Sequence, residues 1–205
     1  MAGTFRSPGV HYLDMQERIR EILEENIALH KNVAGGGVVA SVESAVRAIV
    51  QTFKSRGKVL IAGNGGSAAD SQHFAGELVG YFKDHTRRGY SVIALTTDTS
   101  VLTAWSNDRS FAEVFSRQVE AHGNPGDVFI GISTSGNSQN VLTAFHEAKK
   151  GGLRTIALLG GTGGKMKGLA DIEILVPSDN TPRIQEVHTL VVHVIAELVE
   201  AALAS

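Results

Sequence analysis

The segment Lys58–Phe82, KVLIAGNGGSAADSQHFAGELVGYF, decides the fold of this chain. Four consecutive apolar residues, Val59–Ala62, end abruptly at a glycine, which is typical of a short buried strand. The turn Gly63–Ser67 follows, and apolar residues then recur at helical spacing as far as Val79. A strand, a glycine turn and a helix in this order expose backbone N–H groups at the helix N-terminus, where an anion such as phosphate binds. The segment therefore predicts a phosphate-binding unit.

Two residues capable of acid–base chemistry lie on the predicted helix. His73 and Glu77 are one turn apart and share a face. Histidine–glutamate pairs at this spacing are more often exposed on the helix surface without a function. Because this pair lies on the helix that follows the predicted phosphate loop, a functional role is about equally plausible. A straight helix places Glu77 about 15 Å from Ser67, so the anion and the carboxylate need a long substrate, or a second subunit, between them.

Composition narrows the class of protein. The 205 residues are 42% hydrophobic and 20% charged, which fits one ordinary globular domain with an extension. The net charge of -2 comes without a basic stripe, so nucleic acid is not the expected partner. The absence of cysteine excludes disulfides and thiolate metal sites. Because there is no signal pattern and no apolar run of membrane-spanning length, we expect a cytoplasmic protein that does not bind membranes.

Apolar runs alternate with helical patterns along the rest of the chain. Further strands are expected at residues 91–95, 127–132, 154–159 and 172–176, and helices at 67–82, 110–122, 139–150 and 181–203. This alternation predicts an α/β three-layer sandwich with a five-stranded parallel sheet of the flavodoxin-like type. Ligands of such sheets bind beyond the carboxyl ends of the strands.

An N-terminal helical extension precedes this sheet. Residues 1–9 are expected to be loose, a helix to run from about residue 10 to 32, and a second helix from about 39 to 55. The first helix carries an apolar stripe that includes Met15, Ile19, Leu23 and Ile27. We divide the chain into an extension at 1–56, which contacts another subunit, and a main domain at 57–205.

A second loop, rich in hydroxyl groups, follows the expected strand at 127–132. It reads STSGNS from Ser133 to Ser138 and ends where a helix starts. Helix capping would explain one such hydroxyl, but four in six residues favour a neutral phosphate site built from O–H and N–H donors.

Other motifs are weaker. Gly63, Gly65 and Ala68 match the dinucleotide fingerprint G-x-G-x-x-A, but the acidic residue expected about 20 residues later is missing. The glycine run 160–164 fails as a nucleotide-binding P-loop and is interpreted as a mobile connection. The pair at 107–108 could be turn residues, and spacing alone does not favour His193 over His188.

Four stretches, in this order, resemble the phosphoheptose isomerases of the sugar-isomerase (SIS) domain group: GNGGSAADSQHFAGEL, TTDTSVLTAWSND, GISTSGNSQNVL and RIQEVHTLVVHVIAELVE. The resemblance covers nearly the whole chain. It implies an SIS-domain fold and conversion of sedoheptulose 7-phosphate to D-glycero-D-manno-heptose 7-phosphate, on the route to activated heptose for surface polysaccharides such as lipopolysaccharide. It also implies a homotetramer with active sites at subunit interfaces, and a bound zinc ion.

The resemblance further implies a role for each matching position. Glu77 matches the catalytic base and His193 its acid–base partner. The zinc ligands match His73, Glu77, Gln185 and His193. The positions that match substrate contacts are Asn64, Gly65, Gly66, Glu77, Asn107, Asp108, Ser133, Thr134, Ser135, Ser138 and Gln185.

These residue types suit the implied chemistry, which moves a proton between C1 and C2 through an enediol or enediolate. A carboxylate takes the proton from carbon, and an acid donates a proton to the oxygen that gains negative charge. Zinc could polarise the carbonyl group. A glutamate bound tightly to zinc is a poorer base. We therefore rank the hypothesis that Glu77 is the base above the hypothesis that zinc is essential. Two alternatives are non-catalytic: an SIS-domain protein that binds the replication initiator, and a sugar-phosphate-binding regulator.

Overall fold

Five short apolar segments form a parallel sheet at the centre of the molecule. The computed structural model describes residues 14–204. The strands are β1 (Val59–Gly63), β2 (Val92–Ala94), β3 (Val128–Ser133), β4 (Arg154–Gly160) and β5 (Ile172–Val176), in the order β2-β1-β3-β4-β5. Each pairing is parallel, with Ile61 opposite both Ala94 and Ile130. The expected five-stranded parallel sheet of flavodoxin-like order is confirmed.

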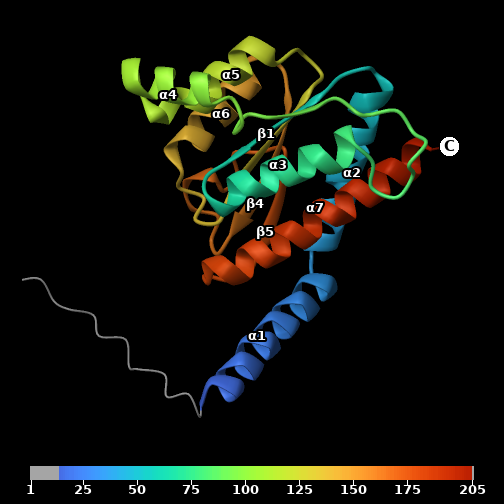
Figure 1. Cartoon of the computed structure of the whole chain (residues 1–205), viewed down its shortest axis with the longest axis vertical. Helices are drawn as coiled ribbons and strands as arrows, with labels where there is room; N and C mark the ends of the chain where they lie inside the picture. Colours follow the sequence, from blue (N-terminus) through green and yellow to red (C-terminus); the bar gives the residue numbers. More distant parts are fainter. Residues whose placement is uncertain (1–13, 205) are drawn as a thin grey trace, which may run out of the picture.

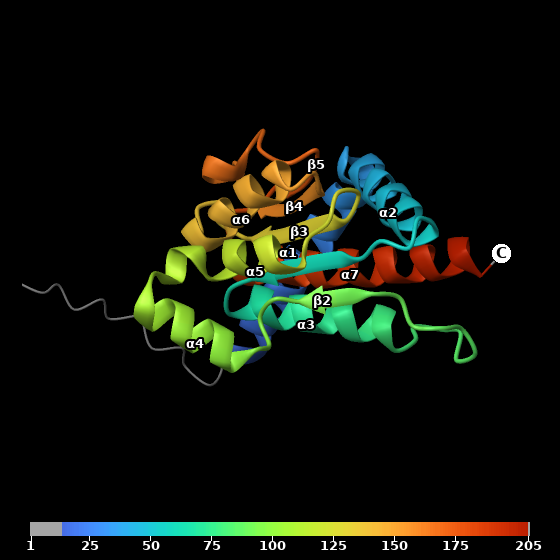
Figure 2. The ribbon, with the colours of Figure 1, turned by 90° about the horizontal axis from the view of Figure 1, so that it is seen from above.

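Residues 14–204 also form seven α-helices. They are α1 (Met15–Gly35), α2 (Val38–Lys54), α3 (Gly66–Val79), α4 (Thr99–Asp108), α5 (Val114–His122), α6 (Gln139–Lys150) and α7 (Thr181–Leu203), with short 3-10 turns at Phe111–Glu113 and Gly164–Met166. Helices α2, α3 and α7 bury their apolar side chains in one core with one face of the sheet, while α5 and α6 form a second core on the other (Figures 1 and 2). Because both faces are covered, the strands β1 and β3 are buried along their whole length.

The two N-terminal helices behave differently. Helix α2 packs against β5 and α7 and contributes Ala45, Ile49 and Phe53 to the core. Helix α1 projects away from the sheet (Figure 1), and only Leu29 and Val33 near its C-terminal end are buried. The loose segment 1–9 and the expected helix start at residue 10 lie outside the described residues. Within 14–204, no single helix is long and apolar enough to cross a membrane; α1 and α2, bent by 68°, meet that test only as a pair.

Three local segments differ from the expected structure or add to it. The segment Thr99–Asp108 forms helix α4, which was not expected, and the pair at 107–108 ends this helix instead of forming a turn. Helix α3 stops at Val79 rather than Phe82, and a loop runs from Gly80 to β2. The glycine run 160–164 lies against the serine-rich loop, and just after it the Met166 N–H donates to the Gly136 carbonyl oxygen at 3.1 Å.

Candidate active site

The order of the strands places the glycine turn and the serine-rich loop side by side. Strands β1 and β3 are neighbours at the centre of the sheet, and the chain leaves them in opposite directions, to β2 on one side and to β4 on the other. The glycine turn follows β1 and the serine-rich loop follows β3. Such a switch point opens a crevice at the carboxyl ends of the strands, which is where ligands of open α/β sheets bind.

A cavity of about 300 Å³ occupies this crevice. Its lining comes from both loops and from the start of α7: Asn64, Gly65, Gly66, Ser67, Ile132, Ser133, Thr134, Ser138, Thr181 and Gln185. The N-terminal ends of α3, α6 and α7 therefore meet at one place. Helix N-termini carry partial positive charge and unpaired N–H groups, so three of them favour an anion without any lysine or arginine in the lining.

The serine-rich loop is held in shape by its own hydroxyl groups. The Gly136 N–H donates to Ser133 Oγ at 3.1 Å, and Ser133 Oγ lies 3.1 Å from Ser138 Oγ. Ser135 is exposed, and its Oγ accepts from the Asn137 N–H at 3.2 Å. Gly136 adopts a φ of +63°, a left-handed conformation that glycine accepts without strain.

Two amide side chains join the glycine turn to the rest of the site. Asn64 and Asn140 exchange hydrogen bonds through both of their amide groups, at 2.9 and 2.8 Å. Asn140 is 3% exposed and stands in the first turn of α6, so this pair couples the two loops. Gln185 of α7 lies against Gly66, where a Cβ atom would come within 2.6 Å of its Nε2.

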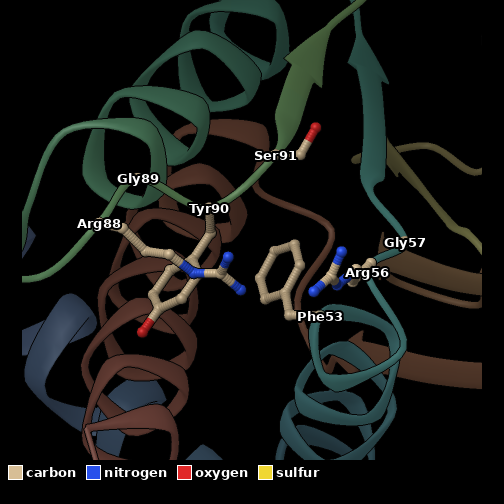
Figure 3. Close-up of a pocket in the computed structure, with 7 residues that line it drawn as sticks. All are labelled: Phe53, Arg56, Gly57, Arg88, Gly89, Tyr90 and Ser91. Carbon is tan, nitrogen blue, oxygen red and sulfur yellow. The ribbon is translucent and has the colours of Figure 1, made fainter.

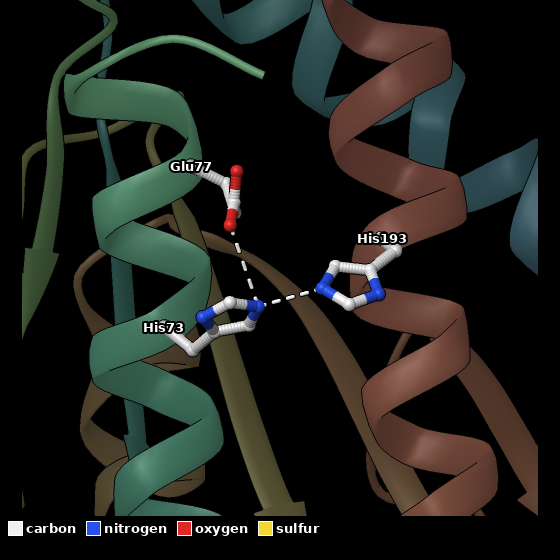
Figure 4. Close-up of side chains that lie close together, drawn as sticks. All are labelled: His73, Glu77 and His193. Carbon is white, nitrogen blue, oxygen red and sulfur yellow. Dashed lines mark hydrogen bonds and ion pairs between the residues drawn. The ribbon is translucent and has the colours of Figure 1, made fainter. Parts of the chain in front are cut away.

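Three potential metal ligands converge further along the same pair of helices. His73 and Glu77 on α3 face His193 on α7 (Figure 4). The two histidine Nε2 atoms are 2.6 Å apart, and the His73 Nε2 lies 3.4 Å from a Glu77 carboxylate oxygen. One ligand atom from each residue falls within 4.8 Å of the others. Two imidazole nitrogens and one carboxylate oxygen are the donor set of many catalytic zinc sites, so these residues fit the metal that the resemblance implied.

A buried carboxylate lies one turn away from this cluster. Asp70 on α3 is 8% exposed and accepts a hydrogen bond from the Thr189 hydroxyl of α7 at 2.8 Å. Burial raises the pKa of the Asp70 carboxyl, while the Thr189 hydrogen bond and the nearby His73 and His193 act in the opposite direction. Neither residue was predicted as part of the site, although Asp70 shares a helix face with His73 and Thr189 shares one with His193.

The loop after α3 is anchored beside His193. Glu200 of α7, buried, accepts from the backbone N–H groups of Phe82, Lys83 and Asp84 and from Arg87 Nε at 2.6 Å. Burial alone would raise the Glu200 pKa, but these hydrogen bonds outweigh it and lower the pKa to about 2. The anchored loop brings the Phe82 ring within 5.8 Å of the His193 ring, centroid to centroid.

Asn107 and Asp108 lie elsewhere in the chain. They end helix α4, are exposed and hydrogen-bond to each other at 2.8 Å, and neither lines the cavity between the loops. Another cavity of about 300 Å³ lies at the amino ends of β1 and β2, where Phe53, Arg56 and Arg88 line it (Figure 3). Since none of the expected site residues lines that second cavity, the carboxyl edge of the sheet is the candidate active site.

Several known proteins are similar to this chain in sequence and in fold. The sequence model of the SIS domain matches residues 38–160. A phosphoheptose isomerase of Helicobacter pylori (strain P12) is 51% identical over 181 residues, which cover 88% of this chain and 93% of the relative. One of Citrifermentans bemidjiense is 54% identical over 168 residues, which cover 82% and 87%. This chain belongs to the phosphoheptose isomerase family. A solved phosphoheptose isomerase from Neisseria gonorrhoeae superposes with a TM-score of 0.86 at 41% identity, over 91% of this chain and 99% of that one.

Membership of the phosphoheptose isomerase family confirms the expected α/β SIS fold and the expected aldose–ketose isomerase class. The cluster at His73, Glu77 and His193 and the cavity at the loops are features of the isolated chain.

Proposed function

We propose that this chain interconverts sedoheptulose 7-phosphate and D-glycero-D-manno-heptose 7-phosphate through an enediol or enediolate. One observation carries the proposal: α3 and α7 together hold an anion cavity at their N-terminal ends and the cluster of His73, Glu77 and His193 one to three turns further on. A phosphorylated sugar lying along these two helices has its phosphate and its reacting carbons at different places, as a seven-carbon substrate requires.

In this scheme the serine-rich loop holds the phosphate. Hydroxyl and N–H donors of the loop surround it: Ser133, Thr134, Ser135 and Ser138. The positions assigned to the sugar are Asn64, Gly65, Gly66 and Gln185, with Asn107 and Asp108 supplied by another subunit. Binding energy from the remote phosphate positions the reacting carbons.

The proton transfer itself falls to two side chains on different helices. The Glu77 carboxylate removes the proton from one of the two reacting carbons and returns it to the other. His193 gives a proton to, or takes one from, the oxygen whose charge changes. Both residues are partly exposed, so the substrate has access to them.

The bound metal is proposed to be zinc, held by His73, Glu77 and His193, with Gln185 as the fourth residue of the expected set. When bound, zinc acts as a Lewis acid toward the carbonyl group. Glu77 is then proposed both as a zinc ligand and as the base. A carboxylate has two oxygen atoms, so one of them would remain available to take the proton of the substrate.

We further propose a cytoplasmic homotetramer that binds neither nucleic acid nor membranes. Its product would enter the synthesis of activated heptose for surface polysaccharides such as lipopolysaccharide.

Turnover tests the proposed reaction. Purified protein is expected to interconvert the ketose and the aldose phosphate, followed by NMR or a coupled assay. Glu77→Gln keeps the size of the side chain and removes the base, so kcat is expected to fall by about 10²–10⁴-fold with the fold intact by circular dichroism. Full activity in this variant would remove Glu77 from the mechanism, and no turnover by the wild-type protein would favour a sugar-phosphate-binding regulator.

Removal of the metal is a separate experiment. Protein treated with a chelator is expected to lose most of its activity and to regain it when Zn²⁺ is added. His73→Ala is expected to lower the zinc content measured by mass spectrometry, because one imidazole ligand is lost. Undiminished activity in metal-free protein would make zinc dispensable for the reaction.

A further inference from the structure

Helices α3 and α7 lie side by side and run in the same direction (Figure 1). Three successive contacts join them, each about one turn beyond the last. Gly66 meets Gln185 at the anion cavity, Asp70 meets Thr189, and His73 meets His193 in the ligand cluster. The Asp70–Thr189 contact is therefore midway between the two parts of the site.

The middle contact is a hydrogen bond to a buried carboxylate. Alongside the three contacts, α3 and α7 share an apolar core that includes Phe74 and Val192. Apolar contacts are non-directional, so by themselves they define the position of one helix along the other only loosely. A hydrogen bond defines both a distance and an angle, and a buried carboxylate that loses its donor is destabilised. The Asp70–Thr189 bond is thus suited to set the register.

The Thr189 hydroxyl has a second acceptor within its own helix. It lies 3.0 Å from the Gln185 carbonyl oxygen and 2.8 Å from Asp70 Oδ1. A hydroxyl bonded only within α7 would make no hydrogen bond to α3. The shorter contact to Asp70 is the one that links α7 to α3.

We propose that Asp70 and Thr189 are a positioning pair, which sets the register of α3 against α7 and so the approach of His73 to His193. Neither residue touches the reacting carbons in this proposal. It rests on the proposed function for its effect on rate, because the cluster is the part of the site that the pair positions. The phosphate end of the site is held separately, by the serine-rich loop.

The kinetic test compares two substitutions at one position. Thr189→Val keeps the shape of the side chain and removes the hydroxyl, and kcat is expected to fall by about 10–100-fold, the effect of misplacing reacting groups by about 1 Å. KM is expected to change little, because the phosphate cavity is intact. Thr189→Ser retains the hydroxyl and is expected to restore kcat.

Thr52→Val is the matched control. Thr52 is a buried threonine on α2 that contacts no residue of the cluster through a hydrogen bond; its hydroxyl donates to the Gly126 carbonyl oxygen at 3.1 Å. The Thr52→Val substitution is expected to lower the melting temperature, as Thr189→Val does, but to leave kcat unchanged. Equal loss of kcat in Thr189→Ser and Thr189→Val, or in Thr52→Val and Thr189→Val, would overturn the proposal.

A structural measurement keeps this inference apart from the proposed reaction. Crystal structures of the wild-type protein and of Thr189→Val, both without metal, give the distance between the Nε2 atoms of His73 and His193. A longer distance in the variant, with the serine-rich loop unchanged, supports a positioning pair whether or not the protein turns over the heptose phosphate. An unchanged distance would overturn the pair, and a wild-type protein without turnover would overturn only the reaction.

Discussion

Two histidines on α7 show how surroundings decide the role of a residue. His193 is partly exposed and faces His73, whereas His188 is fully buried beside β4. The His188 Nε2–H donates to the Leu159 carbonyl oxygen at 3.2 Å, and its Nδ1 has no partner among residues 14–204. Burial lowers the pKa of His188 to about 4. The residue is therefore a neutral member of the core, and the choice between the two histidines that the spacing left open is decided by burial.

This burial predicts a loss of stability in acid. Between pH 6.5 and about 4, the unfolded chain binds a proton at His188 that the folded chain does not bind, so the free energy of unfolding falls as the pH is lowered. His188 is expected to contribute about 2 kcal/mol to the difference in stability between pH 7 and pH 5. Denaturant titrations at both pH values should show a smaller difference for His188→Gln. The exposed His146→Gln is the control, and an unchanged difference in His188→Gln would contradict this assignment.

At the level of elements, two loops that are distant in sequence support each other. The serine-rich loop after β3 packs on the glycine run after β4, and the close approach occurs at Gly136 and Gly163. A Cβ atom on Gly136 would lie 1.9 Å from the Gly163 carbonyl oxygen. The loop can take its shape only because Gly136 has no side chain.

Gly136→Ala is therefore expected to raise KM for the sugar phosphate at least tenfold, because the phosphate loop must move to relieve the clash. Gly126→Ala is a matched control: its φ is +88°, but nothing lies within 4 Å of the added Cβ atom. The control carries the left-handed strain without the clash. Steady-state kinetics of both variants separate the two effects, and equal KM values would show that the contact between the loops does not shape the phosphate site.

At the scale of the whole molecule, a single chain leaves apolar side chains uncovered. Helix α1 exposes Met15, Ile19, Leu23 and Ile27 by 41–57%. Leu190, Val194 and Leu198 form a second exposed row on α7, beside His193. Rows of this kind at helical spacing on monomers are typical of contacts with other subunits. A copy packed on the α7 row would lie next to the ligand cluster, which agrees with the expected sites at subunit interfaces.

Leu23→Asp is expected to break the proposed homotetramer, because a charge replaces the most exposed side chain of the α1 row. Light scattering after gel filtration should show four times the chain mass for the wild type and less for the variant. Glu24→Lys, a neighbouring charge change on an exposed residue of α1, is the control and should remain tetrameric. A wild-type protein of lower mass would contradict the tetramer itself.

The fold could be predicted from the chain because its signals are local. Each strand was expected within one residue of its observed start, and the helices at 139–150 and 181–203 were expected with their observed bounds. These segments bury continuous apolar runs or regular stripes. Helix α4 was not predicted; none of its ten residues is buried, so it lacks the buried apolar face that marks the other helices. The loop after α3 was taken as helix because its anchor, Glu200, lies more than a hundred residues later.

The chain by itself determined the apolar runs of the strands, the glycine turn and the hydroxyl-rich loop, since each depends on neighbours in sequence. Only the tertiary structure decided that His73 and His193 meet, that Asn64 pairs with Asn140, and that Asp70 bonds to Thr189. These contacts depend on how α3 and α7 lie against each other and on which strands are neighbours. Helical spacing tells which face a side chain occupies, but the partner of that face is chosen by the packing of the whole core.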